Sequence, residues 1–309
     1  MRHRQIEATG ISLHFVEEGK GPAVIFCHGF PAIWSCWKAQ IEAVVSAGFL
    51  AIAPDMRGYG ESFAPAEAEA YMPYETVGDL VAILDAADVE TASVVGHDFG
   101  ANIAWNAAMM RPDRFTAVCG MSVPFRPPGS PSFLDKLRAA GRTQFYWFDM
   151  IRAESDQAWE NAAVTVPGMM YWTSGEAPDA DRWDPFDPSR GLLRPAPAAL
   201  RTIDSNTIAD TVAAFTRTGF HGALNYYRAV DPFTRHSTAF VGAKIRQPSM
   251  FLAGTRDGMN LISQPSPESM RSNLTDLRSF TMLEGVGHWV QLEAPDATNA
   301  ALLAFLRSL

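Results

Sequence analysis

The sequence contains only three cysteines, Cys27, Cys36 and Cys119, and no CxxC pair. An odd, low cysteine count excludes a disulfide framework, and without paired spacing there is no zinc-site pattern. We therefore expect a reducing compartment, the cytoplasm. No apolar run approaches the roughly 18 residues of a transmembrane helix, and the N-terminal segment MRHRQIEATG lacks the apolar stretch of a signal peptide, so neither feature is predicted.

Positive charge is also scarce. Lys and Arg total 25 against 34 Asp and Glu, which gives a net charge of −9. Nucleic acids and anionic membranes both require a basic face, so this balance argues against either partner. With 309 residues, 47% hydrophobic and 19% charged, the chain has a globular composition and is long enough for one large domain or for a core with an insertion.

Short apolar runs alternate with helix-like stretches along most of the chain. Continuous apolar runs of this length are typical of strands that are covered on both faces. Strands are predicted over 11–17, 19–27 (after a turn), 49–55, 92–98, 115–121, 248–254 and 278–283, and helices over 35–47, 76–88, 99–111 and 294–308. This alternation predicts an α/β fold with a doubly wound, mostly parallel sheet, in which ligands bind at the carboxyl ends of the strands.

The middle of the chain interrupts this alternation. From about residue 125 it becomes rich in proline, acidic residues and clustered aromatics such as FYWF at 145–148. We interpret 127–232 as a mainly helical cap inserted into a core formed by 1–126 and 233–309. Within it, 176–200 is predicted to be a loop, and a solvent-exposed linker is the simpler interpretation of that stretch.

The strongest local motif is VVGHDFGA at 94–101, which has the form G-x-nucleophile-x-G between a strand and a helix. Gly96 and Gly100 permit a sharp turn that projects Asp98 into a cleft, at the position where many hydrolases carry serine. A carboxylate here can attack an electrophilic carbon and form an ester. The alternative is that Asp98 only caps the following helix.

A second motif, CHGFP at 27–31, follows an earlier strand. Its backbone N–H groups could join that of Phe99 in an oxyanion hole, with Phe30 as the second donor. The alternative is an ordinary Gly-Pro turn in which His28 is held by a neighbour.

Two turns late in the chain complete a triad pattern. Among the seven histidines, only His288, in GHWVQLEAP, lies at a strand-end turn late in the chain, where it could deprotonate water. Asp257, in LAGTRDGMN, could orient that histidine. The alternatives are a packed core histidine and a simple Asp-Gly turn. In some related enzymes the acid follows an earlier strand, but that turn here, MSVPFRPP at 121–128, contains no acid.

Together HGFP, DMRGYGES (55–62), GHDFG and GHW resemble the soluble epoxide hydrolases of the α/β-hydrolase superfamily. The resemblance covers nearly the whole chain and implies an epoxide and water as substrates, with no metal or organic cofactor. It also implies two cap tyrosines that hydrogen-bond the epoxide oxygen. Tyr227 is preferred to Tyr226 because it directly precedes Arg228, and Tyr146 is the candidate for the other. Each could instead be an aromatic of the cap core.

The implied mechanism has two steps: Asp98 opens the ring, and water activated by His288 and Asp257 then hydrolyses the ester to a vicinal diol. An apolar substrate pocket is expected to be lined by four aromatics, unless several of them only pack the cap against the core. These are Trp37, Trp147, Phe148 and Trp172.

Two other functions stay open. Dehalogenases of this fold bind halide through indole or amide donors, or a substrate carboxylate through an arginine, whereas Phe30 and Phe99 occupy the usual positions here and have no side-chain donor. A non-enzymatic receptor on the same scaffold could keep the triad and bind a ligand. Both a monomer and a homodimer are compatible with the sequence.

Overall fold

The computed structural model describes residues 1–129 and 131–309. Its centre is one sheet of eight strands in the order β1-β2-β4-β3-β5-β6-β7-β8. The strands are β1 (Arg2–Ala8), β2 (Ile11–Gly19), β3 (Ala23–Cys27), β4 (Leu50–Pro54), β5 (Ala92–His97), β6 (Phe115–Met121), β7 (Ile245–Gly254) and β8 (Leu274–Leu283). β2 runs antiparallel to both β1 and β4, and the pairs from β4 to β8 are all parallel.

Parallel pairing brings the carboxyl ends of the central strands to one edge. In register, Cys27 of β3 pairs with Gly96 of β5, and His97 of β5 with Met121 of β6. Backbone hydrogen bonds continue one residue past the strand ends, from Asp98 N to Met121 O (3.3 Å) and from Ser122 N to Leu252 O (2.9 Å). The turns singled out in the sequence therefore converge at this edge.

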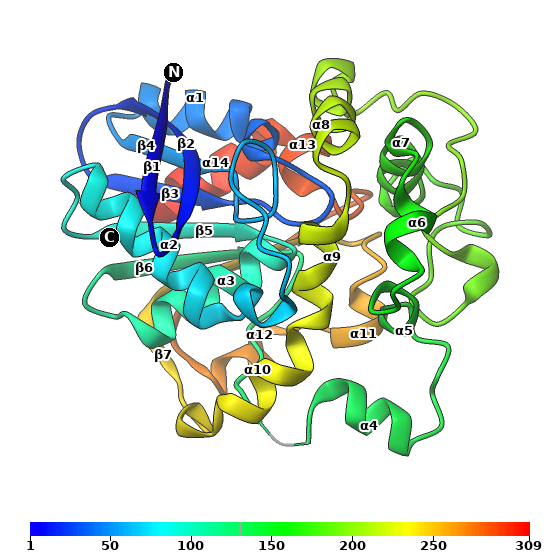
Figure 1. The fold of residues 1–309 in the computed structure, drawn as a ribbon. Helices are drawn as coiled ribbons and strands as arrows, with labels where there is room; N and C mark the ends of the chain where they lie inside the picture. Colours follow the sequence, from blue (N-terminus) through cyan, green and yellow to red (C-terminus); the bar gives the residue numbers. More distant parts are fainter. Residues whose placement is uncertain (130) are drawn as a thin grey trace.

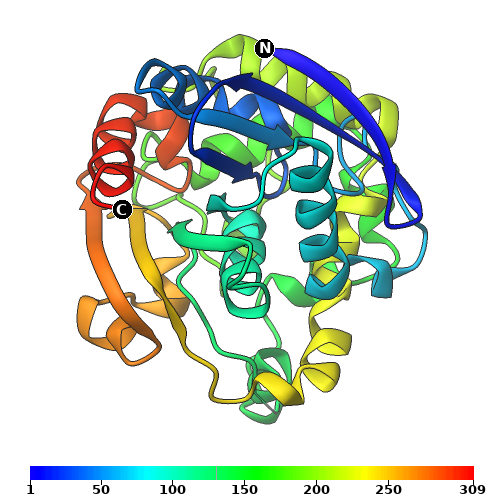
Figure 2. The same ribbon diagram turned by 90° about the vertical axis from the view of Figure 1, so that its left-hand side faces the viewer.

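Helices cover both faces of the sheet (Figure 1). On one face lie α1 (Lys38–Ser46), α13 (Val290–Glu293) and α14 (Pro295–Leu306); on the other lie α2 (Pro73–Ala86) and α3 (Phe99–Met110). Figure 2 shows that α14, at the end of the chain, packs beside α1. β3 and β5 are buried along their whole lengths, as expected of strands covered on both sides.

Between β6 and β7 the described residues form helices and loops and no strand. Figure 1 shows α5 to α8 standing beyond the strand ends, with α9 and α10 leading back to the sheet. The helices are α4 (Phe133–Ala139), α5 (Trp147–Met150), α6 (Ser155–Trp159), α7 (Ala162–Thr173), α8 (Ser205–Thr218), α9 (His221–Arg228) and α10 (Val230–His236). Because α10 crosses residue 232, the domain boundaries 126/127 and 232/233 stay a prediction.

Short helices complete the chain: the 3-10 turns Trp34–Trp37, Ala68–Tyr71, Pro188–Arg190 and Thr238–Phe240, and the helices α11 (Asn260–Ser263) and α12 (Pro267–Arg271). Within residues 1–129 and 131–309, no helix combines the length and the hydrophobicity needed to cross a bilayer.

The predicted α/β architecture is confirmed, with one omission. The sequence analysis did not predict β1, whose residues RHRQIEA alternate between exposed and half-buried positions at the sheet edge. It also treated 176–200 as a possible solvent-exposed linker. That stretch is indeed without helix except for the 3-10 turn Pro188–Arg190, but it buries Trp183 and Leu192 in the hydrophobic core.

Candidate active site

Asp98 occupies the turn between β5 and α3 in a strained backbone conformation, with φ 56° and ψ −120°. Left-handed φ values are costly for a residue with a side chain and persist where the surrounding structure enforces them. The two neighbouring glycines are required because a Cβ on Gly96 would collide with the Gly100 backbone, and one on Gly100 with the Cys27 carbonyl. The Asp98 side chain makes no capping hydrogen bond to α3, so the helix-cap alternative fails.

The HGFP turn lies against the Asp98 carboxylate. The Phe30 backbone N–H donates to Asp98 Oδ1 at 2.9 Å. Gly29 must lack a side chain because a Cβ there would meet Asp98 itself. The Phe30 N–H, one of the two donors predicted for an oxyanion hole, therefore already holds one oxygen of the carboxylate, whereas the Phe99 N–H stays a prediction.

The other carboxylate oxygen faces the histidine. His288 Nε2 lies 3.7 Å from Asp98 Oδ2, and His288 Nδ1 lies 3.2 Å from Asp257 Oδ2. Asp98, Asp257 and His288 are 6%, 3% and 3% exposed, so their charges interact with little screening by water. The structure thus brings together the three residues predicted from separate turns.

Each member of this group has a perturbed pKa. Burial raises the pKa of Asp98, and His288 with the Phe30 and Phe99 N–H groups counteracts part of that rise. Burial disfavours charge on His288, yet the carboxylates of Asp257 and Asp98 raise its pKa overall. Burial likewise opposes ionisation of Asp257, but contact with His288 lowers its pKa. Perturbed titrations grouped in one cleft are typical of a catalytic centre.

The two predicted tyrosines lie near this centre. Tyr227 packs edge-on against Phe99 with the ring centroids 4.6 Å apart, and Tyr146 lies 6.1 Å from Tyr227 on the same measure. Burial, together with the nearby Asp98 charge, raises the pKa of both phenols, which therefore keep their protons. The Tyr226 ring also contacts Phe99, but its hydroxyl donates to the Arg57 carbonyl at 3.0 Å.

Comparison with known proteins shows the family of this chain. The model of the alpha/beta hydrolase fold family matches residues 22–295. An epoxide hydrolase of Caballeronia sordidicola is 49% identical over all of this chain and 94% of its own length. This chain belongs to the epoxide hydrolase family of the α/β-hydrolase superfamily. Epoxide hydrolase B of Mycobacterium tuberculosis is 33% identical and covers 99% of this chain and 98% of its own.

Solved structures of the family give the same result. An epoxide hydrolase from an endophytic Streptomyces superimposes with a TM-score of 0.93 at 34% identity, covering 99% of this chain and 95% of its own. Epoxide hydrolase A from Mycobacterium thermoresistibile gives a TM-score of 0.88 at 34% identity, covering 100% and 98%.

In this family member a cavity of about 390 Å³ opens onto Asp98 and Phe99. Tyr146, Trp147 and Tyr226 border it, whereas Tyr227 is not among the residues that line it. The rest of the wall is mostly apolar and includes Ile103, Val123, Phe133, Phe233, Met259 and Ile262. A cavity of this size and polarity suits a small, largely apolar substrate.

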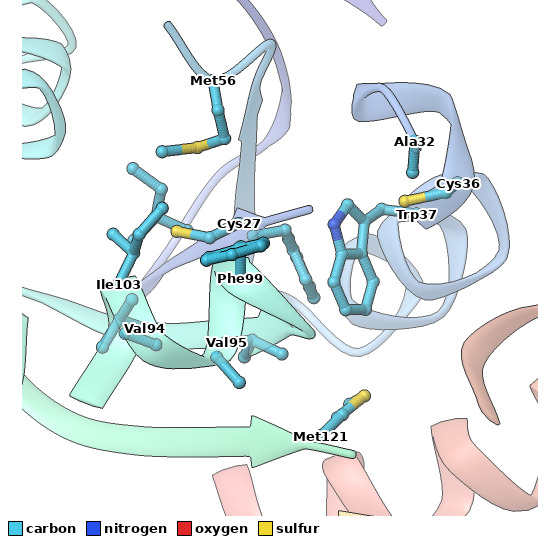
Figure 3. Packing of buried hydrophobic residues seen from close by; sticks show 14 of the residues in the cluster. Cys27, Ala32, Cys36, Trp37, Met56, Val94, Val95, Phe99, Ile103 and Met121 are labelled. Carbon is cyan, nitrogen blue, oxygen red and sulfur yellow. The ribbon is translucent and has the colours of Figure 1, made fainter. Parts of the chain in front are cut away.

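Three of the aromatics predicted for the substrate pocket do not line this cavity. Trp37 is fully buried against Phe26, and Figure 3 shows it within the packed core. Trp172 lies under the Arg194 guanidinium and donates to the Arg194 carbonyl at 3.1 Å. Phe148 packs in a small separate cluster of the cap, beside Arg138.

Sequence analysis missed the residues that hold the histidine turn. Glu293 accepts three backbone N–H groups, from Gly175 (2.7 Å), Trp289 (2.9 Å) and Gly287 (3.0 Å), and so joins the cap to this turn. His97 Nε2 donates to the His288 carbonyl at 2.8 Å, and burial lowers the pKa of His97 to about 3, which keeps it neutral. A Glu five residues after His288 in GHWVQLE was the available signal.

Ser122 was also missed. It follows β6, and its hydroxyl lies 2.6 Å from Asp257 Oδ2 and 2.9 Å from His288 Nδ1. The turn that contains it, MSVPFRPP at 121–128, has no acid. A short polar side chain at the same sheet edge was the signal that could have found it.

Proposed function

We propose that this enzyme opens epoxides with water to vicinal diols through an ester on Asp98. The observation that carries the proposal is the placement of the two carboxylate oxygens. Oδ1 is held by the Phe30 N–H, which leaves Oδ2, 3.7 Å from His288, as the oxygen available for attack. The full-length similarity to proteins named epoxide hydrolase supports the substrate class.

In the first step, Asp98 Oδ2 attacks one ring carbon and the C–O bond of the epoxide breaks. The electron pair of that bond goes to the ring oxygen, which takes a hydrogen bond or a proton from Tyr146 and Tyr227. Because both phenols keep their protons, they can act as general acids near neutral pH. The product is a hydroxyalkyl ester of Asp98.

In the second step, His288 removes a proton from water, and the water oxygen attacks the ester carbonyl carbon. The negative charge then develops on Oδ1, which already accepts the Phe30 N–H at 2.9 Å. Preorganised donors at this atom stabilise the tetrahedral state. When that state collapses, the diol leaves with the original Oδ2, and the water oxygen stays on Asp98.

This exchange of oxygen provides a sharp test. In water labelled with heavy oxygen, one turnover should label Asp98 and leave the diol unlabelled, as measured by mass spectrometry of the diol and of the Asp98 peptide. His288→Ala should accumulate the ester on that peptide, and Asp98→Ala should form none while remaining folded. Label that appears first in the diol would refute the ester mechanism.

A dehalogenase is the second candidate. Trp147 borders the cavity, and its buried indole nitrogen has no hydrogen-bond partner among the described residues, so it could serve a halide. A haloalkane panel therefore accompanies the epoxide panel. If the enzyme released halide from a haloalkane and formed no diol from any epoxide, the dehalogenase function would replace our proposal.

We further propose that the enzyme works in a reducing compartment, the cytoplasm, because Cys27, Cys36 and Cys119 are all buried free thiols. That the enzyme is a monomer or a homodimer stays a prediction, which a measurement of its molecular mass in solution would test.

A further inference from the structure

Ser122 lies between the acid and the base of the active site. Its Oγ is 2.6 Å from Asp257 Oδ2 and 2.9 Å from His288 Nδ1, whereas Asp257 itself reaches that nitrogen only at 3.2 and 3.3 Å. The serine oxygen is thus the nearest partner of Nδ1. Hydrogen bonds from N–H to oxygen are usually 2.7 to 3.2 Å long, so the serine contact is the better formed one.

The hydrogen-bond donors and acceptors among Ser122, Asp257 and His288 can be assigned. The ionised Asp257 accepts only, with Oδ1 taking the Met259 backbone N–H at 2.9 Å and Oδ2 taking the Ser122 O–H. A hydroxyl that donates its one proton still has lone pairs to accept another. Ser122 Oγ therefore accepts the Nδ1–H of His288, and that proton is shared between the serine and the carboxylate.

The backbone at Ser122 supports a role for the side chain. Ser122 has φ 69° and is completely buried. Glycine adopts this conformation at lower cost than any residue with a Cβ. A side chain at a position that favours glycine, aimed at two catalytic groups, is more than a packing element.

We propose that Ser122 is a positioning residue that fixes the ring orientation and tautomer of His288 for ester hydrolysis. The inference depends on the two-step function proposed above. By accepting Nδ1–H it keeps the Nε2 lone pair directed toward water beside Asp98. The first step uses no base, so ring opening by Asp98 does not depend on Ser122.

Single-turnover kinetics of Ser122→Gly and Ser122→Ala test this role. Quenched samples are analysed by mass spectrometry for the Asp98 ester and for the diol, which separates its formation from its hydrolysis. Loss of a charge-assisted hydrogen bond should slow hydrolysis about tenfold to a hundredfold, while ester formation stays within about threefold. Ser122→Gly should melt at least as high as Ser122→Ala, because glycine tolerates the positive φ.

The pH profile distinguishes positioning from a general loss of order. Ser122 accepts the Nδ1–H of His288, and an acceptor at this proton favours the imidazolium, so its removal should lower the pKa of His288. The acid limb of the hydrolysis step should shift to lower pH in both variants. Ser249→Ala is the matched control: this buried serine bonds the Asp276 carbonyl at 3.1 Å, and its loss should leave the pH profile unmoved.

A mutant cycle with Asp257→Asn completes the design. If Ser122 acts through this pair, adding Ser122→Gly to Asp257→Asn should slow hydrolysis much less than it does in the wild type. Wild-type hydrolysis rates in both Ser122 variants, equal slowing of both steps, or full additivity in the cycle would each overturn the proposal. Failure of the wild type to form any ester would instead refute the proposed function, so the two failures are distinguishable.

Discussion

The ring-opening step can be tested by replacing each of two adjacent tyrosines, Tyr226 and Tyr227, with phenylalanine. Tyr227 and Tyr226 are both buried in α9, but their hydroxyl groups face different surroundings. Both rings contact Phe99, and Tyr226 also borders the cavity. The negative charge of Asp98 contributes to the raised pKa of the Tyr227 phenol, whereas the Tyr226 hydroxyl donates to the Arg57 carbonyl at 3.0 Å. Replacing each by phenylalanine removes one oxygen atom and keeps the ring.

Tyr227→Phe should slow ester formation, because a donor to the developing alkoxide is lost. A hydrogen bond to a charged group contributes about 1.5 to 3 kcal/mol, which corresponds to roughly a tenfold to hundredfold lower rate. The effect stays finite because Tyr146, which borders the cavity, still donates. Ester hydrolysis should change little, since the ring oxygen is already a hydroxyl at that stage.

Tyr226→Phe should instead lower the stability of the fold and leave ester formation nearly unchanged. It leaves the Arg57 carbonyl without this donor, which costs about 1 to 3 kcal/mol of folding free energy, and it should leave ester formation within about threefold. Rapid-quench mass spectrometry of the Asp98 peptide gives the rate, and urea unfolding gives the stability. Equal slowing by the two variants, or normal ester formation in Tyr227→Phe, would refute the assignment of the donor.

Two further predictions concern pH and the cap. Ring opening needs ionised Asp98, and hydrolysis needs neutral His288. Nearby carboxylates raise the pKa of His288 above its ordinary 6.5, whereas the pKa of Asp98 rises from a much lower ordinary value of 3.8. As the pH falls, His288 should therefore become protonated before Asp98, and hydrolysis should stop first. The ester should therefore accumulate in quenched samples as the pH is lowered, and an ester fraction independent of pH would contradict this order. Glu293→Gln should cost about 1.5 to 3 kcal/mol of stability, because a neutral amide replaces a carboxylate that accepts three backbone N–H groups, and it should slow hydrolysis by loosening the His288 turn. Urea unfolding and single-turnover rates measure both effects, and an unchanged unfolding midpoint would count against this role.

The sequence predicted most of the sheet and the triad for the same physical reason. Buried parallel strands appear as continuous apolar runs, and the turn after each run lies at the edge where ligands bind. Asp98, Asp257 and His288 each follow such a run, so local sequence was enough to place them together. β1 escaped detection because an edge strand with polar residues has no such run.

Side-chain partners were harder to predict than backbone positions. Trp37, Trp147 and Trp172 have the same composition signal, but the first packs in the core, the second borders the cavity, and the third lies against Arg194. The hydrophobic periodicity of short helices does not indicate whether a tryptophan packs in the core, borders the cavity or lies against another side chain. Trp183 is a similar case, since it lies in a stretch without periodicity and is buried by tertiary contacts alone.

The position of the carboxylate explains why an aspartate suits this turn. In hydrolases with serine at the same turn, the oxyanion hole receives an oxygen of the substrate. Here the corresponding N–H holds an oxygen of the proposed nucleophile, because the Phe30 N–H bonds Asp98 Oδ1 in the substrate-free structure. In the proposed mechanism the Phe30 N–H therefore acts twice, first to keep the buried carboxylate ionised for attack and then to stabilise the oxyanion as its ester is hydrolysed. Since the donors are backbone groups, substitution of the Phe30 or Phe99 side chain would leave both functions in place, whereas a Cβ at Gly29 would displace the carboxylate and remove both.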